Sequence, residues 1–154
     1  MIAHINIGTN KGDRMANLSR AVSLISRISD SVSRISSIIE TDSWGYNSPN
    51  KFLNQAVEIS FSSTPQTLLE KLHQIEVEID DSPHRDSNGG YIDRIIDIDL
   101  VYIDNRIISS DSLIIPHPRL QSRYFVLKLI DEISPDWVHP ILNKTAKQLI
   151  KELK

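Results

Sequence analysis

Cysteine is absent from this chain of 154 residues, and the absence limits its chemistry. It excludes a disulfide scaffold, a thiol nucleophile and a zinc site with cysteine ligands. No apolar run approaches the ~18 residues that a membrane span requires. The first ten residues, MIAHINIGTN, lack the basic region and the long apolar region of a signal peptide. We therefore predict a cytoplasmic protein without membrane contacts.

An excess of positive charge is also missing. The chain has 17 basic and 20 acidic residues, which gives a net charge of −3 at pH 7. A domain that coats duplex DNA is normally basic overall, so we predict no nucleic-acid partner. With 40% hydrophobic and 24% charged residues, the composition is that of an ordinary globular protein. The length and the lack of a repeat or linker indicate one domain, residues 1–154.

The spacing of hydrophobic residues predicts an alternation of strands and helices. Asp13, Thr64 (before Pro65) and Asn143 are candidate helix N-caps, and the polar segment 80–93 predicts a long loop. The expected elements are strand 2–8, helix 14–29, strand 31–41, strand 52–61, helix 65–79, strand 94–103, strand 106–109, helix 121–131 and helix 144–153. This order predicts an α+β fold: a ferredoxin-like βαββαβ sandwich with an antiparallel sheet, helices on one face and a small C-terminal helical appendage.

Asp97 and Asp99 form the strongest chemical signal in the sequence. Residues two apart in a strand point to the same face, with Cα atoms ~7 Å apart, so both carboxylates reach one small volume. Ile98 points the other way, toward the core. Two such anions repel unless a cation lies between them, and Mg²⁺ commonly binds one or two carboxylates together with substrate phosphates. The pair predicts a Mg²⁺ site; two solvated aspartates on an exposed sheet face are the alternative.

A histidine between two prolines gives a second signal, in Ile115–Arg119. The prolines fix the backbone around His117. Arg119 and Arg123 are four residues apart and are expected to share a helix face that suits a polyphosphate. A rigid loop with solvated arginines is the alternative.

An aromatic residue and an amide, Phe52 and Asn54, share one face of a predicted strand, opposite the face of Leu53 and Val57. This arrangement suits a flat heterocycle, which needs a stacking surface and hydrogen bonds at its edge. The alternative is a hairpin with a solvent-exposed phenylalanine.

Taken together, these segments resemble the 6-hydroxymethyl-7,8-dihydropterin pyrophosphokinase family of folate biosynthesis. The resemblance covers nearly the whole chain, and the strand Arg-x-x-Asp-x-Asp followed by Pro-His-Pro-Arg is its most specific part. The matching segments are Gly8-Thr9-Asn10, Thr41 and Gly45, Phe52-Leu53-Asn54, Ile75-Glu76, Asp93 to Asp99, Ile115 to Arg119, and Arg123 with Phe125.

The resemblance implies a transferase, an ATP-dependent diphosphokinase that moves pyrophosphate from ATP to the hydroxymethyl group of the reduced pterin and releases AMP. It also implies two Mg²⁺ ions, small-molecule substrates and a monomer. The implied site residues are Thr41, Gly45, Phe52, Asn54 and Phe125 for the pterin; His73, Glu76, Arg94, Ile98, His117 and Arg123 for ATP; Asp97 and Asp99 for metal; and Asp97, Asp99, Arg94 and Arg85 for catalysis.

One loop departs from the family pattern. Asp80 and Asp81 stand where most members have Gly-Arg, so His84 and Arg85 are the basic groups that the loop can bring to ATP. Two other interpretations remain open at this point. One is a non-catalytic pterin- or nucleotide-binding module with a degenerate loop, and the other is a different Mg²⁺-dependent phosphotransferase.

Overall fold

The structure is a computed structural model that describes residues 1–42, 49–80 and 93–153. Its main sheet consists of β1 (Ile2–Thr9), β2 (Ser31–Ile35), β3 (Ile39–Thr41), β4 (Phe52–Ser60) and β5 (Asp97–Ile103). The strand order is β2-β4-β1-β5, β3 pairs with the other end of β4, and every pairing is antiparallel. The ferredoxin-like α+β prediction is confirmed.

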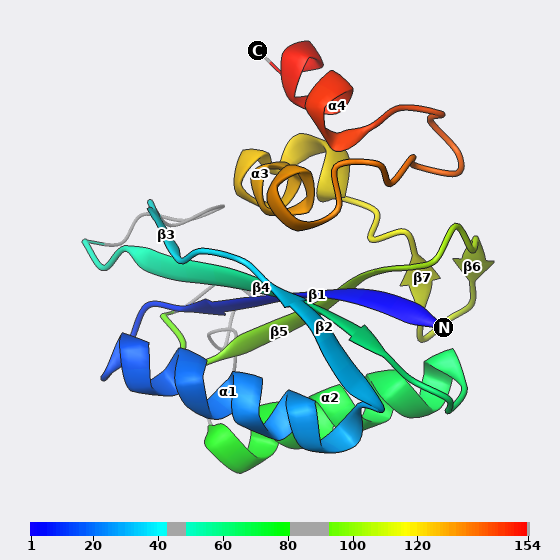
Figure 1. Cartoon of the computed structure of the whole chain (residues 1–154). Helices are drawn as coiled ribbons and strands as arrows, with labels where there is room; N and C mark the ends of the chain where they lie inside the picture. The colour runs from blue at the N-terminus through cyan, green and yellow to red at the C-terminus, as the bar shows by residue number, and fades with distance from the viewer. Residues whose placement is uncertain (43–48, 81–92, 154) are drawn as a thin grey trace.

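Helices cover both faces of the sheet (Figure 1). One face carries α1 (Arg14–Ile28) and α2 (Pro65–Ile79), which begin at the predicted caps Asp13 and Thr64. Over the other face lie α3 (Tyr124–Ile133), which follows the short 3-10 helix η1 (Leu120–Ser122), and α4 (Ala146–Glu152). In the C-terminal appendage, α3 packs on the second face of the sheet and α4 packs on α3.

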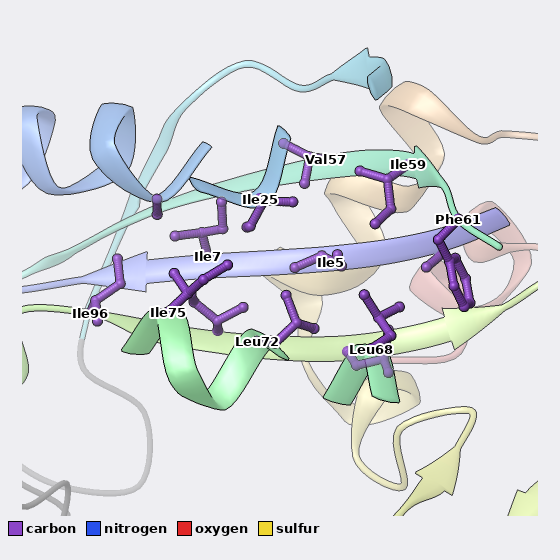
Figure 2. Close-up of a cluster of buried hydrophobic side chains, with 14 of the residues drawn as sticks. Ile5, Ile7, Ile25, Val57, Ile59, Phe61, Leu68, Leu72, Ile75 and Ile96 are labelled. Atoms are coloured by element: carbon purple, nitrogen blue, oxygen red, sulfur yellow. The ribbon is translucent and has the colours of Figure 1, made fainter. Parts of the chain in front are cut away.

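The main core lies between the sheet and the pair α1 and α2. Because side chains alternate along a strand, Ile5 and Ile7 of β1 point to this side together with Ile98 of β5. Figure 2 shows Leu68, Leu72 and other side chains from α1, α2, β1 and β4 meeting in one cluster. A second, smaller cluster joins α3 and α4 to β5 through Val101, Leu127 and their neighbours. On the sheet face beneath α3, the part that neither cluster covers has polar residues, among them Asn6, Asn54 and Asp99.

Four local predictions were wrong in detail. The expected strand 31–41 is two strands, because Ser36 interrupts the ladder: its N–H donates to Ala56 O (2.9 Å), and its Oγ accepts from Ala56 N (2.8 Å). β5 begins at Asp97 and not at 94, because the backbone of Arg94 is bonded to Asn10: Asn10 N donates to Arg94 O (3.0 Å), and Arg94 N donates to Asn10 Oδ1 (2.8 Å).

The other two concern the C-terminal third. The strand expected at 106–109 is β6 (Ile108–Ser109), which pairs with β7 (Ile114–Ile115) in a separate hairpin. The last helix is capped by Thr145, which makes a capping box with Gln148. Asn143 instead adopts a left-handed backbone conformation, with φ of 57°.

A buried histidine, His4 on β1, makes the stability of this fold depend on pH. His4 is fully buried, stacks on Tyr102 with 5.2 Å between ring centroids, and finds no hydrogen-bond partner for either ring nitrogen among the described residues. Burial lowers its pKa from 6.5 to about 3. The unfolded chain therefore binds a proton before the folded chain does, and stability is lost as the pH falls from 6.5 toward 3.

We expect His4 alone to lower the free energy of unfolding by about 2 kcal/mol between neutral pH and pH 5, since each pKa unit corresponds to 1.36 kcal/mol. His4→Phe keeps a flat ring and removes the titrating group, so it should lose this part of the pH dependence. Urea unfolding of both proteins at pH 7.5 and pH 5 measures the difference. The remaining histidines are common to both proteins and cancel. Equal losses in the two proteins would contradict the assignment.

Candidate active site

The polar residues of the sheet gather where β1 runs between β4 and β5. The antiparallel register sets Gly8 between Asn54 on β4 and Asp97 on β5. The next position on the same face, Asn6, lies between Ala56 and Asp99. Three neighbouring strands thus bring two carboxylates and two amides to one surface, although these residues are up to 93 positions apart in sequence.

A pocket opens on this surface. Eight of the residues predicted for the site line it, and they come from β3, β4, β5 and the segments before β5 and at the start of α3. The lining residues are Asn6, Gly8, Thr41, Asp42, Phe52, Asn54, Arg94, Asp97, Asp99, Arg123 and Phe125. The structure therefore joins four of the five predicted pterin residues (Thr41, Phe52, Asn54 and Phe125) with the predicted metal residues Asp97 and Asp99 in a single pocket.

Aromatic and amide groups shape one part of the pocket. Phe52 and Phe125 both line it, as the prediction of two aromatic walls requires. Asn54 is only 3% exposed and donates from Nδ2 to Thr41 Oγ1 (2.8 Å), which fixes the direction of its amide. Gly8 keeps the floor open, because a Cβ at this position would lie 3.3 Å from Asn54 Oδ1 and 3.5 Å from Phe52 Cδ1. This part of the pocket therefore combines two aromatic side chains with an amide and a hydroxyl group.

Charge is concentrated in the other part of the pocket. Arg94 Nη1 lies 2.8 Å from Asp97 Oδ1, and Arg123 Nη1 lies 3.6 Å from Asp99 Oδ2. Burial raises the pKa of Asp99, and the positive charges of Arg123 and Arg94 oppose this rise. A bound divalent cation would oppose it further, because a nearby positive charge favours the ionised carboxylate.

The two carboxylates fit Mg²⁺ only if the substrate completes its coordination shell. Within residues 1–42, 49–80 and 93–153 no group of three or more His, Asp or Glu side chains is placed to hold a metal. Mg²⁺ is commonly held by one or two carboxylates together with substrate phosphates and water. The Asp97 and Asp99 pair meets that requirement.

A second cavity adjoins the first and shares Asp99 with it. Four of its residues, His73, Ile98, Asp99 and His117, were predicted from the sequence, and it lies between α2, β5 and the β6–β7 hairpin. The complete lining is Leu69, His73, Ile98, Asp99, Leu100, Asp111, Ser112, Leu113, Ile114, His117 and Pro118. A third cavity lies beside both and is lined by Arg94, Asp97, Asp99, His117, Pro118, Arg119 and Arg123. Three cavities therefore meet at Asp99.

His117 is uncharged at neutral pH. Burial, together with the positive charges of Arg123 and Arg119, lowers its pKa to about 4. Its Nδ1 accepts from Arg119 N (3.2 Å), so the proton of the neutral ring lies on Nε2. A neutral imidazole of this kind can donate one hydrogen bond to a phosphate oxygen.

Glu76 acts on the backbone of β5. Its carboxyl group accepts a hydrogen bond from Ile98 N (2.9 Å). Because β5 is an edge strand, this backbone N–H has no partner on a neighbouring strand, and Glu76 satisfies it instead. Burial and the nearby charges of Asp97 and Asp99 raise the pKa of Glu76 to about 8. The described lining of the second cavity does not include Glu76. Its contact with Ile98 sets the position of the strand that carries both aspartates.

Three predictions need separate comment. Gly45 and Arg85 lie outside the described residues, so their roles stay predictions. The expected common helix face of Arg119 and Arg123 is wrong: Arg119 precedes η1, and Arg123 lies between η1 and α3. Both arginines nevertheless line the third cavity, because the turn between them brings them together.

Several lining residues were missed by sequence reasoning. Asn6, Asp42, Asp111 and Ser112 were not assigned a role from the sequence. Asn6 could have been found from strand alternation, since it shares a face with Gly8. For the hairpin residues Asp111 and Ser112 no such signal exists, because only the fold of β6 and β7 brings them to α2.

Comparison with known proteins gives consistent matches. Residues 4–135 match the family described as 7,8-dihydro-6-hydroxymethylpterin-pyrophosphokinase. A 2-amino-4-hydroxy-6-hydroxymethyldihydropteridine pyrophosphokinase of Bacillus subtilis is 41% identical over 133 residues, which are 86% of this chain and 77% of that protein. The protein of the same name from Aquifex aeolicus is 30% identical over 149 residues, 97% of this chain and 90% of its own length.

Solved structures agree in fold. A crystal structure of an HPPK-DHPS in complex with substrates superposes with a TM-score of 0.76 at 16% sequence identity, and the match covers 98% of this chain and 42% of that one. Among the described residues, no helix has the length and apolar character needed to cross a membrane.

Proposed function

Since the chain belongs to the 7,8-dihydro-6-hydroxymethylpterin-pyrophosphokinase family, we propose that its pocket transfers pyrophosphate from ATP to the hydroxymethyl group of 6-hydroxymethyl-7,8-dihydropterin. The hydroxyl oxygen attacks the β-phosphorus and its proton is released to water, while the bond from that phosphorus to the oxygen of the α-phosphate breaks and AMP leaves with the electron pair of that bond. The observation that carries the proposal is the position of Asp99, which lines the aromatic pocket, the second cavity and the arginine-lined cavity between them.

The aromatic pocket takes the pterin. Phe52 and Phe125 provide stacking surfaces, and the fixed amide of Asn54 together with Thr41 binds the polar edge of the ring. The second cavity, with His73 and Ile98, takes the nucleotide. Arg94, His117 and Arg123 then lie between the two ligands, where the triphosphate must pass.

Mg²⁺ is the metal that the residues suit best. Asp97 and Asp99 would hold it, and the family pattern leads us to propose two ions. When bound, the ions supply charge neutralisation for the transferred group. The chain itself positions both substrates and presents Arg94 and Arg123 to the phosphate oxygens.

We also propose that residues 1–154 work as one pyrophosphokinase unit, as a monomer, with Arg85 as a further cation for ATP. The cytoplasm is the compartment we propose, because the reaction draws on a pool of ATP. We propose no nucleic-acid partner, since the net charge of −3 does not favour one.

One assay tests the proposed function against the two other interpretations. The protein is incubated with ATP, Mg²⁺ and the pterin alcohol, and AMP and the pterin diphosphate are measured. We expect AMP only when the pterin is present. Binding without turnover would favour a non-catalytic module, and phosphate release without pterin would favour a different phosphotransferase or hydrolase.

The aromatic walls give a prediction about selectivity. We expect Phe52→Ala and Phe125→Ala each to weaken pterin binding about 10- to 100-fold, because truncation removes an aromatic contact of about 0.5–1.5 kcal/mol and further apolar area. Binding of ATP should change less than threefold. Calorimetric titration of each ligand measures both values. Tyr124→Ala is the matched control, since Tyr124 precedes Phe125 but is 53% exposed and does not line the pocket. Equal losses for the two ligands would argue against the aromatic walls.

A further inference from the structure

Asn6 has no place in the site predicted from the sequence, yet its side chain lines the aromatic pocket. It is only 4% exposed. Its Oδ1 is buried and has no hydrogen-bond partner among the described residues. A buried acceptor without a partner destabilises a folded protein, and such groups are rare in native structures. The pocket therefore contains an oxygen that residues 1–42, 49–80 and 93–153 leave unsatisfied.

The sheet register places this oxygen beside Asp99. Asn6 is the cross-strand partner of Asp99 on β5 and of Ala56 on β4. Side chains of such partners have Cβ atoms about 4.5–5.5 Å apart. Ala56 has no polar side-chain atom and packs against Leu129 and Ile133 of α3. Within this row of the sheet, the Asn6 amide and the Asp99 carboxylate are thus the two polar groups that face the ligand.

Asn6 and Gly8 lie two residues apart on β1 and therefore face the same side of the sheet. Gly8 lies between Asn54 and Asp97 and forms the open floor under the space beside Phe52. A flat ring on that floor places one end near the amide of Asn54. A substituent that reaches Asp99, where the three cavities meet, passes Asn6.

We propose that Asn6 orients the substrate hydroxyl: its Oδ1 accepts a hydrogen bond from the hydroxymethyl group of the pterin and turns the hydroxyl oxygen toward the β-phosphorus. The inference rests on the proposed function, because it requires the reacting hydroxyl to lie at the Asp99 end of the pocket. A carboxamide is not a base at neutral pH, so Asn6 positions the hydroxyl group and takes no proton from it. Correct alignment of a nucleophile contributes to rate through orientation.

A merely structural role for Asn6 gives a different expectation. If the amide stabilised the fold, its removal would lower the melting temperature. An unsatisfied acceptor predicts the opposite, since an apolar group of similar size removes the penalty. We therefore expect Asn6→Leu to have the melting temperature of the wild type or a higher one, with reduced kcat.

Binding of two pterins tests the contact itself. The affinities of 6-hydroxymethyl-7,8-dihydropterin and of its 6-methyl analogue, which lacks the hydroxyl, are measured by calorimetry for the wild type and Asn6→Leu, with Mg²⁺ and a non-hydrolysable ATP analogue present. The wild type should prefer the alcohol about tenfold. In Asn6→Leu this preference should fall below twofold, and affinity for the methyl compound should stay within twofold. Asn6→Ala provides the same test with a smaller side chain, in case leucine blocks the pocket.

Steady-state kinetics provides the second measurement. We expect kcat of both variants to fall about 10- to 100-fold, with KM for ATP within threefold of the wild type. An unchanged preference for the alcohol in both variants would overturn the role of Asn6 while leaving the proposed function intact. A wild type that binds neither pterin would overturn the proposed function, and the role of Asn6 with it.

Discussion

Asp97→Asn and Asp99→Asn should each reduce kcat by about three orders of magnitude or more while the fold is kept. Each change removes one of the two neighbouring carboxylates of β5 that we propose as Mg²⁺ ligands. Charge neutralisation by a metal is worth several kcal/mol in the transition state, and about 4 kcal/mol corresponds to a 10³-fold change in rate. Stability should change little, since both side chains face the pocket and Ile98 between them fills the core.

The measurement is a titration of kcat with Mg²⁺ for each variant, together with thermal unfolding. Asp136→Asn is the matched control, because it removes one negative charge from an exposed position outside the pocket. The control should retain the wild-type rate. Wild-type-like turnover of either site variant at saturating Mg²⁺ would show that the pair is not the metal site.

Arg123→Ala should lower kcat/KM for ATP by about 10²- to 10³-fold. Arg123 lines both the aromatic pocket and the third cavity, which contains His117, so its guanidinium lies on the path that we propose for the triphosphate. Removing one preorganised hydrogen-bond donor from a site of developing negative charge costs about 2.7–4 kcal/mol. Arginine binds phosphate bidentately, so Arg123→Lys should restore only part of the loss.

The same substitution should change the response to Mg²⁺. Arg123 lies 3.6 Å from Asp99 and opposes the rise of the Asp99 pKa. Without this charge the pKa of Asp99 rises further, so the Mg²⁺ concentration that Arg123→Ala needs for half-maximal activity should rise more steeply with falling pH than that of the wild type. Steady-state kinetics at two pH values tests both effects. Arg106→Ala, at an exposed position in the turn after β5, is the control. An equal response of the two variants would contradict the role of Arg123.

The helix starts and the strand faces of this protein were predicted correctly from the sequence, because they depend on interactions between residues close together in the chain. The helices begin after the caps Asp13 and Thr64 because each of these side chains accepts from the backbone N–H three residues ahead, and a cap needs no distant partner. The common face of Asp97 and Asp99 follows from the two-residue period of a strand. The same period correctly placed Phe52 and Asn54 opposite the core.

Features that depend on partners distant in sequence could not be predicted in this way. Whether Ser36 continues a strand depends on its contact with Ala56, which lies 20 residues further along the chain. The start of β5 depends on the bonds between Arg94 and Asn10, 84 residues apart. The helical periodicity that seemed to join Arg119 and Arg123 is broken by η1, and only the packing of Leu120 in the second core fixes that turn.

By itself, the sequence determined the kinds of element, their order, the acidic pair and the aromatic face, because each follows from neighbours within a few residues. Only the tertiary structure decided which of these surfaces meet. The pairing of β1 with both β4 and β5 places Asn6 beside Asp99, and α3 then brings Phe125 over the same pocket. The unsatisfied oxygen of Asn6 is visible only there, because hydrogen bonding of a buried group depends on every element around it.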